Sequence, residues 1–142
     1  MRVTNVEALQ AQGALSKLLE LDLPVLVSVD VALVSNLVDK QVGVFSRVRD
    51  KLFKDYSIKT EPGETEGSIK FSCTAKGENE EETKKLQSGN LETFGDKFNA
   101  LLEAKTEDLD FRKIKLPKEI DGKPMLVKSS ILKSLTEFVE VE

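Results

Sequence analysis

The sequence predicts a single α+β domain over residues 1–142 that is mainly helical, with about four helices, one of them long, and a small antiparallel β-hairpin or sheet. Apolar residues recur at helical spacing over most of the chain, and this periodicity is most regular between residues 25 and 56. Only residues 68–75 alternate cleanly between apolar and polar side chains, which is typical of a strand with one buried face. Aromatic residues make up 6% of the 142 residues, so the core consists mainly of Leu and Val, as in packed helices.

The first helix is expected to begin after Thr4, because Thr4-Asn5-Val6-Glu7 has the form of a capping box. It should extend to about Leu21, and Leu23-Pro24 ends it, since the residue before a proline avoids the α region. The expected apolar stripe consists of Leu9, Leu15, Leu18, Leu19 and Leu21.

A long amphipathic helix is expected from Val25 or Leu26 to near Tyr56, with Gln41 at one skipped core position. A helix of roughly 30 residues spans ~45 Å. This is long for a domain of this size, so part of its stripe is expected to contact another copy of the chain. The candidate interface residues are Val27, Val31, Val34, Val38 and Phe45, and the stripe continues to Val48 and Leu52. Leu33, Leu37 and Val44 form a second apolar flank.

A β-hairpin is expected next, because Glu61-Pro62-Gly63-Glu64 is a turn signature between Ile58 and the alternating run. Ile69, Phe71 and Cys73 should share its buried face, and the acidic loop 61–67 should be exposed.

A third helix is predicted from about Glu80 to about Ala104, with Gly89-Asn90 as a possible break. A short strand then follows within residues 109–116, ended by Pro117. Asp121-Gly122 marks a turn, and Ser129 or Ser130 is expected to cap a final helix. That helix should bury Ile131, Leu132, Leu135 and Phe138.

The chain has no histidine and no tryptophan, and Cys73 is its only cysteine. There is therefore no imidazole base, no Ser-His or Cys-His couple, no internal disulfide and no thiolate or imidazole metal site. Cys73 itself is expected to act as a small hydrophobic residue of the strand. We therefore expect a protein that is not an enzyme and that carries no cofactor and no metal.

Carboxylates leave two weaker alternatives. Glu61, Glu64 and Glu66 could hold a hard cation such as calcium, but their spacing fits no known loop and a solvated hairpin tip explains them better. Asp108 and Asp110 could form a paired-carboxylate site on one strand face, but a solubilising role at the end of a helix explains them better.

The charge distribution bears on possible partners. The net charge is −4, and residues 61–110 carry 6 basic and 13 acidic groups, a balance that disfavours general nucleic-acid binding. The dense basic run is a candidate contact for a phosphate, a nucleotide or an acidic partner surface, or it protects a sheet edge from pairing. It consists of Arg112, Lys113, Lys115 and Lys118.

No signal peptide is expected, because residues 1–10 are polar, and Asp22 and Asp30 interrupt the most hydrophobic stretch, which argues against a membrane span. The lone cysteine fits a reducing compartment, so a cytoplasmic protein is expected.

Several segments resemble a family of small uncharacterised proteins encoded by tailed bacteriophages and prophages. They are residues 1–5, 18–25, 47–56, 98–102 and 113–142, with the Leu-Pro-Val break before the long helix and the closing Ile-Leu-Lys-Ser-Leu-Thr-Glu-Phe pattern as the main features. The resemblance implies a bacterial cytoplasm or a virion as the setting and brings no activity or functional residues.

The leading hypothesis is therefore a non-enzymatic binding or assembly accessory protein that forms homo-oligomers and contacts a phage or host protein. The alternative is a counter-defence protein that sequesters a nucleotide signal or inhibits a host immune protein.

Overall fold

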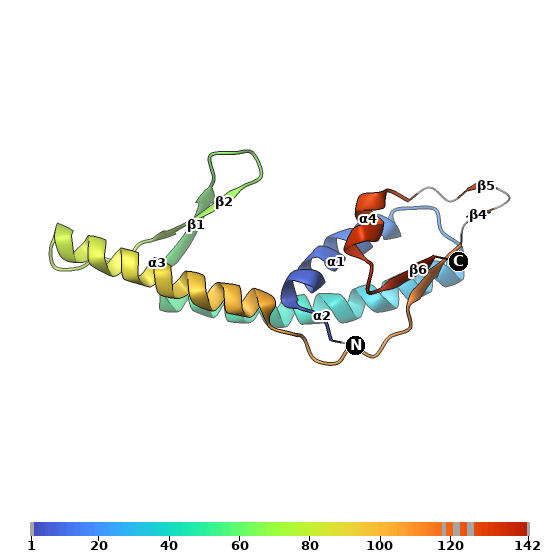
Figure 1. The fold of residues 1–142 in the computed structure, drawn as a ribbon, viewed down its shortest axis with the longest axis horizontal. Helices are drawn as coiled ribbons and strands as arrows, with labels where there is room; N and C mark the ends of the chain where they lie inside the picture. Colours follow the sequence, from blue (N-terminus) through green and yellow to red (C-terminus); the bar gives the residue numbers. More distant parts are fainter. Residues whose placement is uncertain (1, 118, 121–122, 125–126, 142) are drawn as a thin grey trace. The chain divides into compact units, whose positions relative to one another are not determined.

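The computed structural model describes residues 2–117, 119–120, 123–124 and 127–141. Its helices and strands follow the chain as shown in Figure 1. They are α1 (Asn5–Leu19), α2 (Val25–Asp55), β1 (Ile58–Pro62), β2 (Ile69–Cys73), α3 (Glu80–Glu103), β3 (Ile114–Leu116), β4 (Glu119–Ile120), β5 (Lys123–Pro124), α4 (Ser129–Ser134) and β6 (Val139–Val141). This confirms the predicted α+β class, with one long helix and a small antiparallel hairpin.

The contacts within the chain group its residues into two compact units. The first unit contains Met1–Val44 and Ala104–Glu142, and the second contains Phe45–Glu103. Residues of α2 belong to both units. The single domain expected from the sequence stays a prediction.

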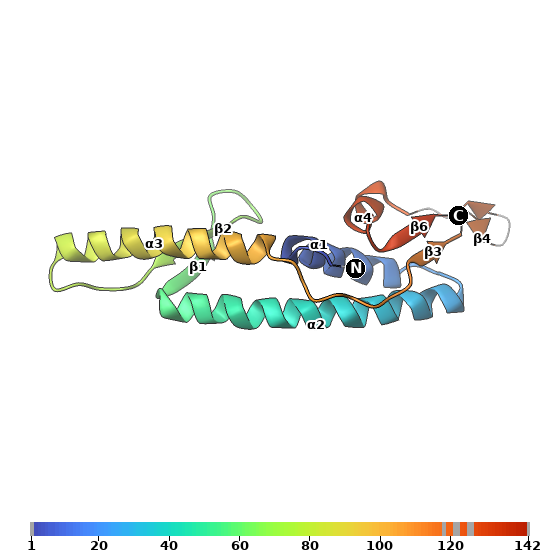
Figure 2. The same ribbon diagram turned by 60° about the horizontal axis from the view of Figure 1, so that its bottom comes forward.

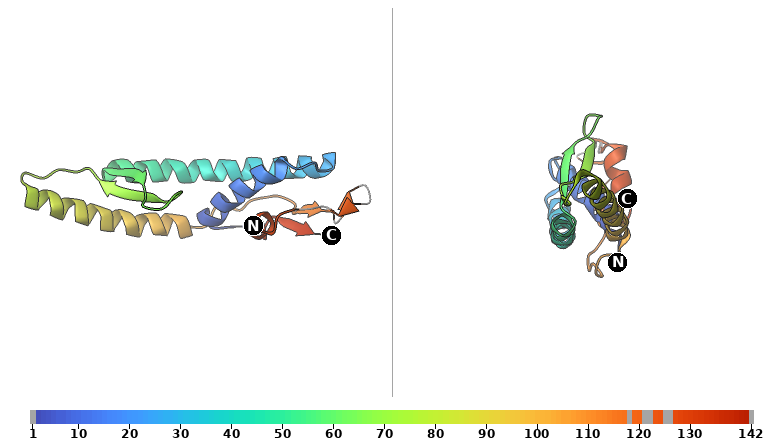
Figure 3. Two further views of the ribbon diagram at one scale, coloured as in Figure 1. Left: turned by 90° about the horizontal axis from the view of Figure 1, so that it is seen from above. Right: turned by 90° about the vertical axis from the view of Figure 1, so that its left-hand side faces the viewer.

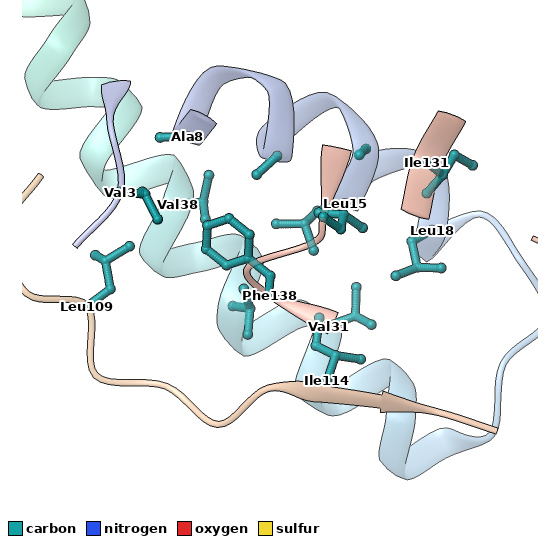
Figure 4. Packing of buried hydrophobic residues seen from close by; sticks show 14 of the residues in the cluster. Val3, Ala8, Leu15, Leu18, Val31, Val38, Leu109, Ile114, Ile131 and Phe138 are labelled. Atoms are coloured by element: carbon teal, nitrogen blue, oxygen red, sulfur yellow. The ribbon is translucent and has the colours of Figure 1, made fainter. Parts of the chain in front are cut away.

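The core of the first unit is formed by α1, the first part of α2, β3, α4 and the residues that follow α4. Side chains from these elements point toward one another around Phe138 (Figure 4). Leu15, Leu18 and Ile114 are completely buried there, and Phe138 is 1% exposed. The two ends of this unit in the sequence are also tied together, because the Asn5 N–H donates to the Ala104 carbonyl at 3.0 Å.

The predicted capping box of α1 is confirmed. The Glu7 N–H donates to Thr4 Oγ1 at 3.2 Å, and the Thr4 N–H donates to Glu7 Oε1 at 3.0 Å. The predicted apolar stripe needs correction, because Leu19 is 42% exposed and Leu9 is only partly buried. The buried face follows the spacing 8, 11, 15 and 18, so that alanines occupy core positions beside Leu15 and Leu18. Small residues on this face allow neighbouring elements to approach closely.

The first unit also contains a parallel strand pair that the sequence did not predict. β3 pairs with β6 in the register Ile114↔Val139 and Leu116↔Val141, and Figure 2 shows the two strands side by side. Parallel strands need a crossover connection, and α4 lies on this one. The strand expected within residues 109–116 is correspondingly shorter, since only Ile114–Leu116 has a partner strand. β4 and β5 form a separate antiparallel pair, and the expected Asp121-Gly122 turn lies outside the described residues.

The final helix differs from the prediction at its start and in its length. Lys128 is the N-cap and makes no side-chain capping bond, whereas Ser129 and Ser130 lie inside the helix. The helix has 6 residues, so Leu135 and Phe138 are buried from the segment beyond its end.

The second unit packs the predicted β1–β2 hairpin and α3 around aromatic side chains, and Figure 3 shows the hairpin beside α3. The ring centroids of Phe71 and Phe94 lie 5.2 Å apart, and those of Phe53 and Phe94 lie 5.5 Å apart. Ile58, Cys73 and Phe94 are the buried residues of this cluster, and Phe45 of the same unit is 3% exposed.

Two local predictions in this unit need correction. Ile69 is 67% exposed, because it pairs with Pro62 at the far end of the hairpin, away from the core residue pair Ile58↔Cys73. The Gly89-Asn90 step does not break α3, which runs without interruption from Glu80 to Glu103. Asn90 is held instead by its side-chain amide, which donates to the Tyr56 carbonyl at 3.3 Å.

Candidate binding groove

A groove in the first unit runs between α2 and the extended segment 110–112. Its first hollow has a volume of about 500 Å³ and is lined by both apolar and polar residues. The lining residues are Asp30, Leu33, Val34, Asn36, Leu37, Asp110, Phe111 and Arg112. The α2 residues at 30, 33, 34 and 37 share one side of the helix because they are three or four positions apart.

The position of segment 110–112 follows from the packing of Phe111. Its ring stacks on that of Phe138, with centroids 5.2 Å apart and planes inclined by 23°. Phe138 is itself buried in the core of the first unit. The wall of the hollow opposite α2 is thus anchored to the core by an aromatic pair, while the polar neighbours of Phe111 remain accessible.

A second hollow of about 360 Å³ adjoins the first and is lined by Asp30, Arg112, Lys113, Lys115 and Glu140. The two hollows share Asp30 and Arg112, whose carboxylate and guanidinium lie 3.6 Å apart. The side chain of Arg112 is 89% exposed, and exposed ion pairs contribute only about 0.2–1 kcal/mol. An incoming anion can therefore compete with Asp30 for Arg112 at small cost.

The structure brings together three of the four predicted basic residues. Arg112, Lys113 and Lys115 are all exposed and all line the second hollow. Lys115 points outward because it alternates on β3 with the buried Ile114 and Leu116. The fourth predicted residue, Lys118, lies outside the described residues.

The predicted interface residues of α2 lie mostly in the chain's own core. Val31, Val34, Val38 and Phe45 are at most 3% exposed, and Val27 is partly buried. Gln41 takes the expected skipped core position and is 8% exposed. The exposed apolar side of α2 is instead a neighbouring flank, which we call the outer face. Its residues in the first unit are the exposed Leu26, Val29, Leu33 and Val44 and the half-buried Leu37.

The outer face is strongly exposed for an apolar surface. Leu26 is 80% exposed, Leu33 is 57% exposed and Val44 is 51% exposed. Leu33 and Leu37 also line the first hollow, so the outer face and the groove form one continuous surface. In the sequence, this surface is visible as the second apolar flank at Leu33, Leu37 and Val44.

The carboxylate alternatives are not assembled into sites. Glu61, Glu64 and Glu66 are exposed on the hairpin and its loop, and no group of three or more potential metal-ligating side chains occurs in the described part of the chain. Asp108 and Asp110 lie in a segment without strand structure, and Asp110 lines the first hollow.

Cys73 lies in the core of the second unit, where its thiol donates to the Tyr56 carbonyl at 3.3 Å. The Asn90 amide donates to Cys73 Sγ at 3.7 Å. The thiol is thus buried in this core and has two polar neighbours. The residues of the groove are distant from it in the sequence.

Among the described residues, no helix combines the length and the apolar character that crossing a membrane requires. Comparisons of the chain with protein-family models, with curated proteins and with solved structures found no match.

Proposed function

We propose that this chain is a non-enzymatic binding and assembly protein that acts through protein–protein contacts, including contacts between its own copies. The observation that carries the proposal is the outer face of α2. Large apolar side chains that are exposed next to one another are characteristic of interaction surfaces rather than of free protein surface. The outer face is also adjacent to a groove that can receive a side chain of a partner.

The spacing along the outer face supports a role in association. Leu26, Leu33, Leu37 and Val44 are separated by 7, 4 and 7 residues, which places them in one line along a helix of 3.6 residues per turn. Such a line is the surface that packs against another helix or into a groove of a partner. The core-facing residues Val31, Val34 and Val38 lie on a different side and hold α2 in the fold.

Sedimentation velocity at micromolar concentration tests the self-association. The wild-type chain is expected to sediment above the mass of one 15.8 kDa chain. Leu33→Asp places a charge on the outer face and should shift the protein to the monomer. Ala32→Asp is the matched control, because Ala32 is the adjacent exposed residue of the same helix but lies outside the outer face. A wild-type mass of one chain at every concentration refutes the proposal.

A second candidate function rests on a different observation. Arg112, Lys113 and Lys115 line the second hollow, and Phe111 lines the first hollow that adjoins it. Basic side chains bind phosphate, and an apolar wall can pack against the base of a nucleotide. The chain would then act as a counter-defence protein that sequesters a nucleotide signal, or as an inhibitor of a host immune protein. Isothermal titration with a panel of cyclic and linear nucleotides tests the first form, and Lys113→Glu should abolish any binding found.

The proposed setting is a bacteriophage or prophage, which is supported by the resemblance of the segments at residues 1–5, 18–25 and 113–142. The site of action would then be the bacterial cytoplasm or the virion, and the partner a phage or host protein. Affinity capture from infected cells, with mass spectrometry of proteins and nucleotides, distinguishes assembly from counter-defence. Tail or capsid proteins support the first function, and a host immune protein or a nucleotide supports the second.

A further inference from the structure

The residues that line the groove indicate which side chains a bound segment would carry. The first hollow offers Leu33, Leu37 and Phe111 to an apolar side chain. The adjoining hollow offers Arg112, Lys113 and Lys115 to carboxylates, although Asp30 and Glu140 also line it. Asp30 is already paired with Arg112, whereas Lys113 and Lys115 form no ion pair within the described part of the chain. A fitting segment therefore presents an exposed aliphatic residue directly beside glutamates or aspartates.

The tip of the β1–β2 hairpin is such a segment. Ile69 is 67% exposed and stands opposite Pro62 in the strand register. Glu61, Glu64 and Glu66 lie within or next to the intervening loop and are exposed. The aliphatic side chain at the tip thus lies next to the loop that carries Glu64 and Glu66, whereas Glu61 is paired with Lys59 at 3.8 Å and stands opposite Lys70 in the strand register.

The tip is also held in a defined conformation. The Gly63 N–H donates to the Ser68 carbonyl at 2.9 Å, and the Ser68 hydroxyl donates to the Thr65 carbonyl at 2.7 Å. Gly67 has a φ of +81°, a conformation that glycine adopts without strain. Because the loop is already ordered by these bonds, docking it costs less conformational entropy than docking a flexible segment.

We propose that the groove of one copy receives the hairpin tip of a second copy. Ile69 would occupy the first hollow against Leu33, Leu37 and Phe111, and Glu64 and Glu66 would face Lys113 and Lys115. A hollow of about 500 Å³ is large enough for Ile69 together with the neighbouring Pro62. This inference rests on the proposed self-association and assigns to it, beside the outer face of α2, a contact between the groove and the hairpin tip.

The proposed contact joins two different surfaces of the chain, and each copy offers one groove and one hairpin tip. Where two copies exchange tips reciprocally about a two-fold axis, the contact closes a dimer. Where each tip enters the groove of the next copy, the copies form a ring if the rotation between them closes and an open filament if it does not. Both arrangements differ from one in which the outer faces of two copies meet each other.

A charge swap tests the contact. Lys113→Glu/Lys115→Glu makes the second hollow acidic while the loop of the hairpin tip stays acidic, and Glu64→Lys/Glu66→Lys makes that loop basic while the second hollow keeps its net positive charge. Each double variant alone is expected to associate at least about tenfold more weakly than the wild type, because like charges then meet at the contact. Mixed at equal concentrations, the two variants should associate again, since each acidic surface then meets a basic one.

Sedimentation velocity at micromolar concentration provides the readout, and circular dichroism confirms that each variant keeps its helices. Lys84→Glu/Lys85→Glu is the matched control, since it makes the same change in net charge at exposed positions of α3. Recovery of association only in the mixture supports the inference. A wild type that associates, with both double variants associating equally well, overturns the inference but leaves the proposed function standing. A wild type that stays monomeric overturns both.

Discussion

Leu33 and Val34 are adjacent in α2, but substitution by Asp should lower the free energy of unfolding far more at Val34 than at Leu33. Val34 is 2% exposed in the core of the first unit, so Val34→Asp loses the whole stabilisation from burying this side chain, about 1.5–3 kcal/mol. An unpaired carboxylate in that position adds a desolvation penalty of several kcal/mol. Leu33 is 57% exposed, so Leu33→Asp loses less than half of a similar burial, about 1 kcal/mol, and its charge remains in water.

Urea unfolding followed by circular dichroism measures both changes. Small domains have a total free energy of unfolding of about 5–15 kcal/mol. Val34→Asp should therefore unfold the first unit or strongly lower the urea concentration at which half of it is unfolded. Leu33→Asp should shift the midpoint slightly while reducing association. Similar losses of stability for the two variants would refute the assignment of Val34 to the core and Leu33 to the outer face.

Three further predictions concern other parts of the fold. Thr4→Ala removes the capping bonds at the start of α1 and should lower the free energy of unfolding by about 1 kcal/mol, measured by urea titration; an unchanged midpoint would contradict the observed capping geometry. Phe94→Ala should lower the free energy of unfolding by about 3–5 kcal/mol in the same titration, because Phe94 is 2% exposed and contacts three other rings, whereas Leu86→Ala, at a residue that is 41% exposed, should stay close to wild type. Cys73 should react with a thiol reagent much more slowly in native buffer than in denaturant, because its side chain is buried; equal rates would show that the strand is oriented differently.

The elements that the sequence predicted well are those with strong local signals. The Thr4–Glu7 box marks the start of α1, the periodicity from Val25 defines α2, and the alternation before Cys73 defines β2. The parallel pairing of β3 with β6 was not predictable in the same way. Val139–Val141 is too short to form a clear pattern, and its partner lies more than twenty residues away in the sequence.

The candidate site could be predicted only in part. The basic run at Arg112, Lys113 and Lys115 is visible as a local cluster of charge, and the second apolar flank of α2 is visible as periodicity. The basic run and this flank line one groove because segment 110–112 lies along α2, and the stacking of Phe111 on Phe138 holds that segment in place. Periodicity also could not decide which of the two flanks of α2 faces the core.

The order of the two units along the chain has a consequence for folding. The second unit is one continuous segment, Phe45–Glu103, whereas the first is assembled from residues on both sides of it. During synthesis, the second unit is therefore complete before β3, α4 and β6 of the first unit exist. Because contacts between distant residues form slowly, the first unit should be the slower part to fold. Until its last strand is made, the core side of α2 at Val31, Val34 and Val38 lacks the partners that follow residue 104, and this nascent chain exposes more apolar surface to aggregation than the finished chain.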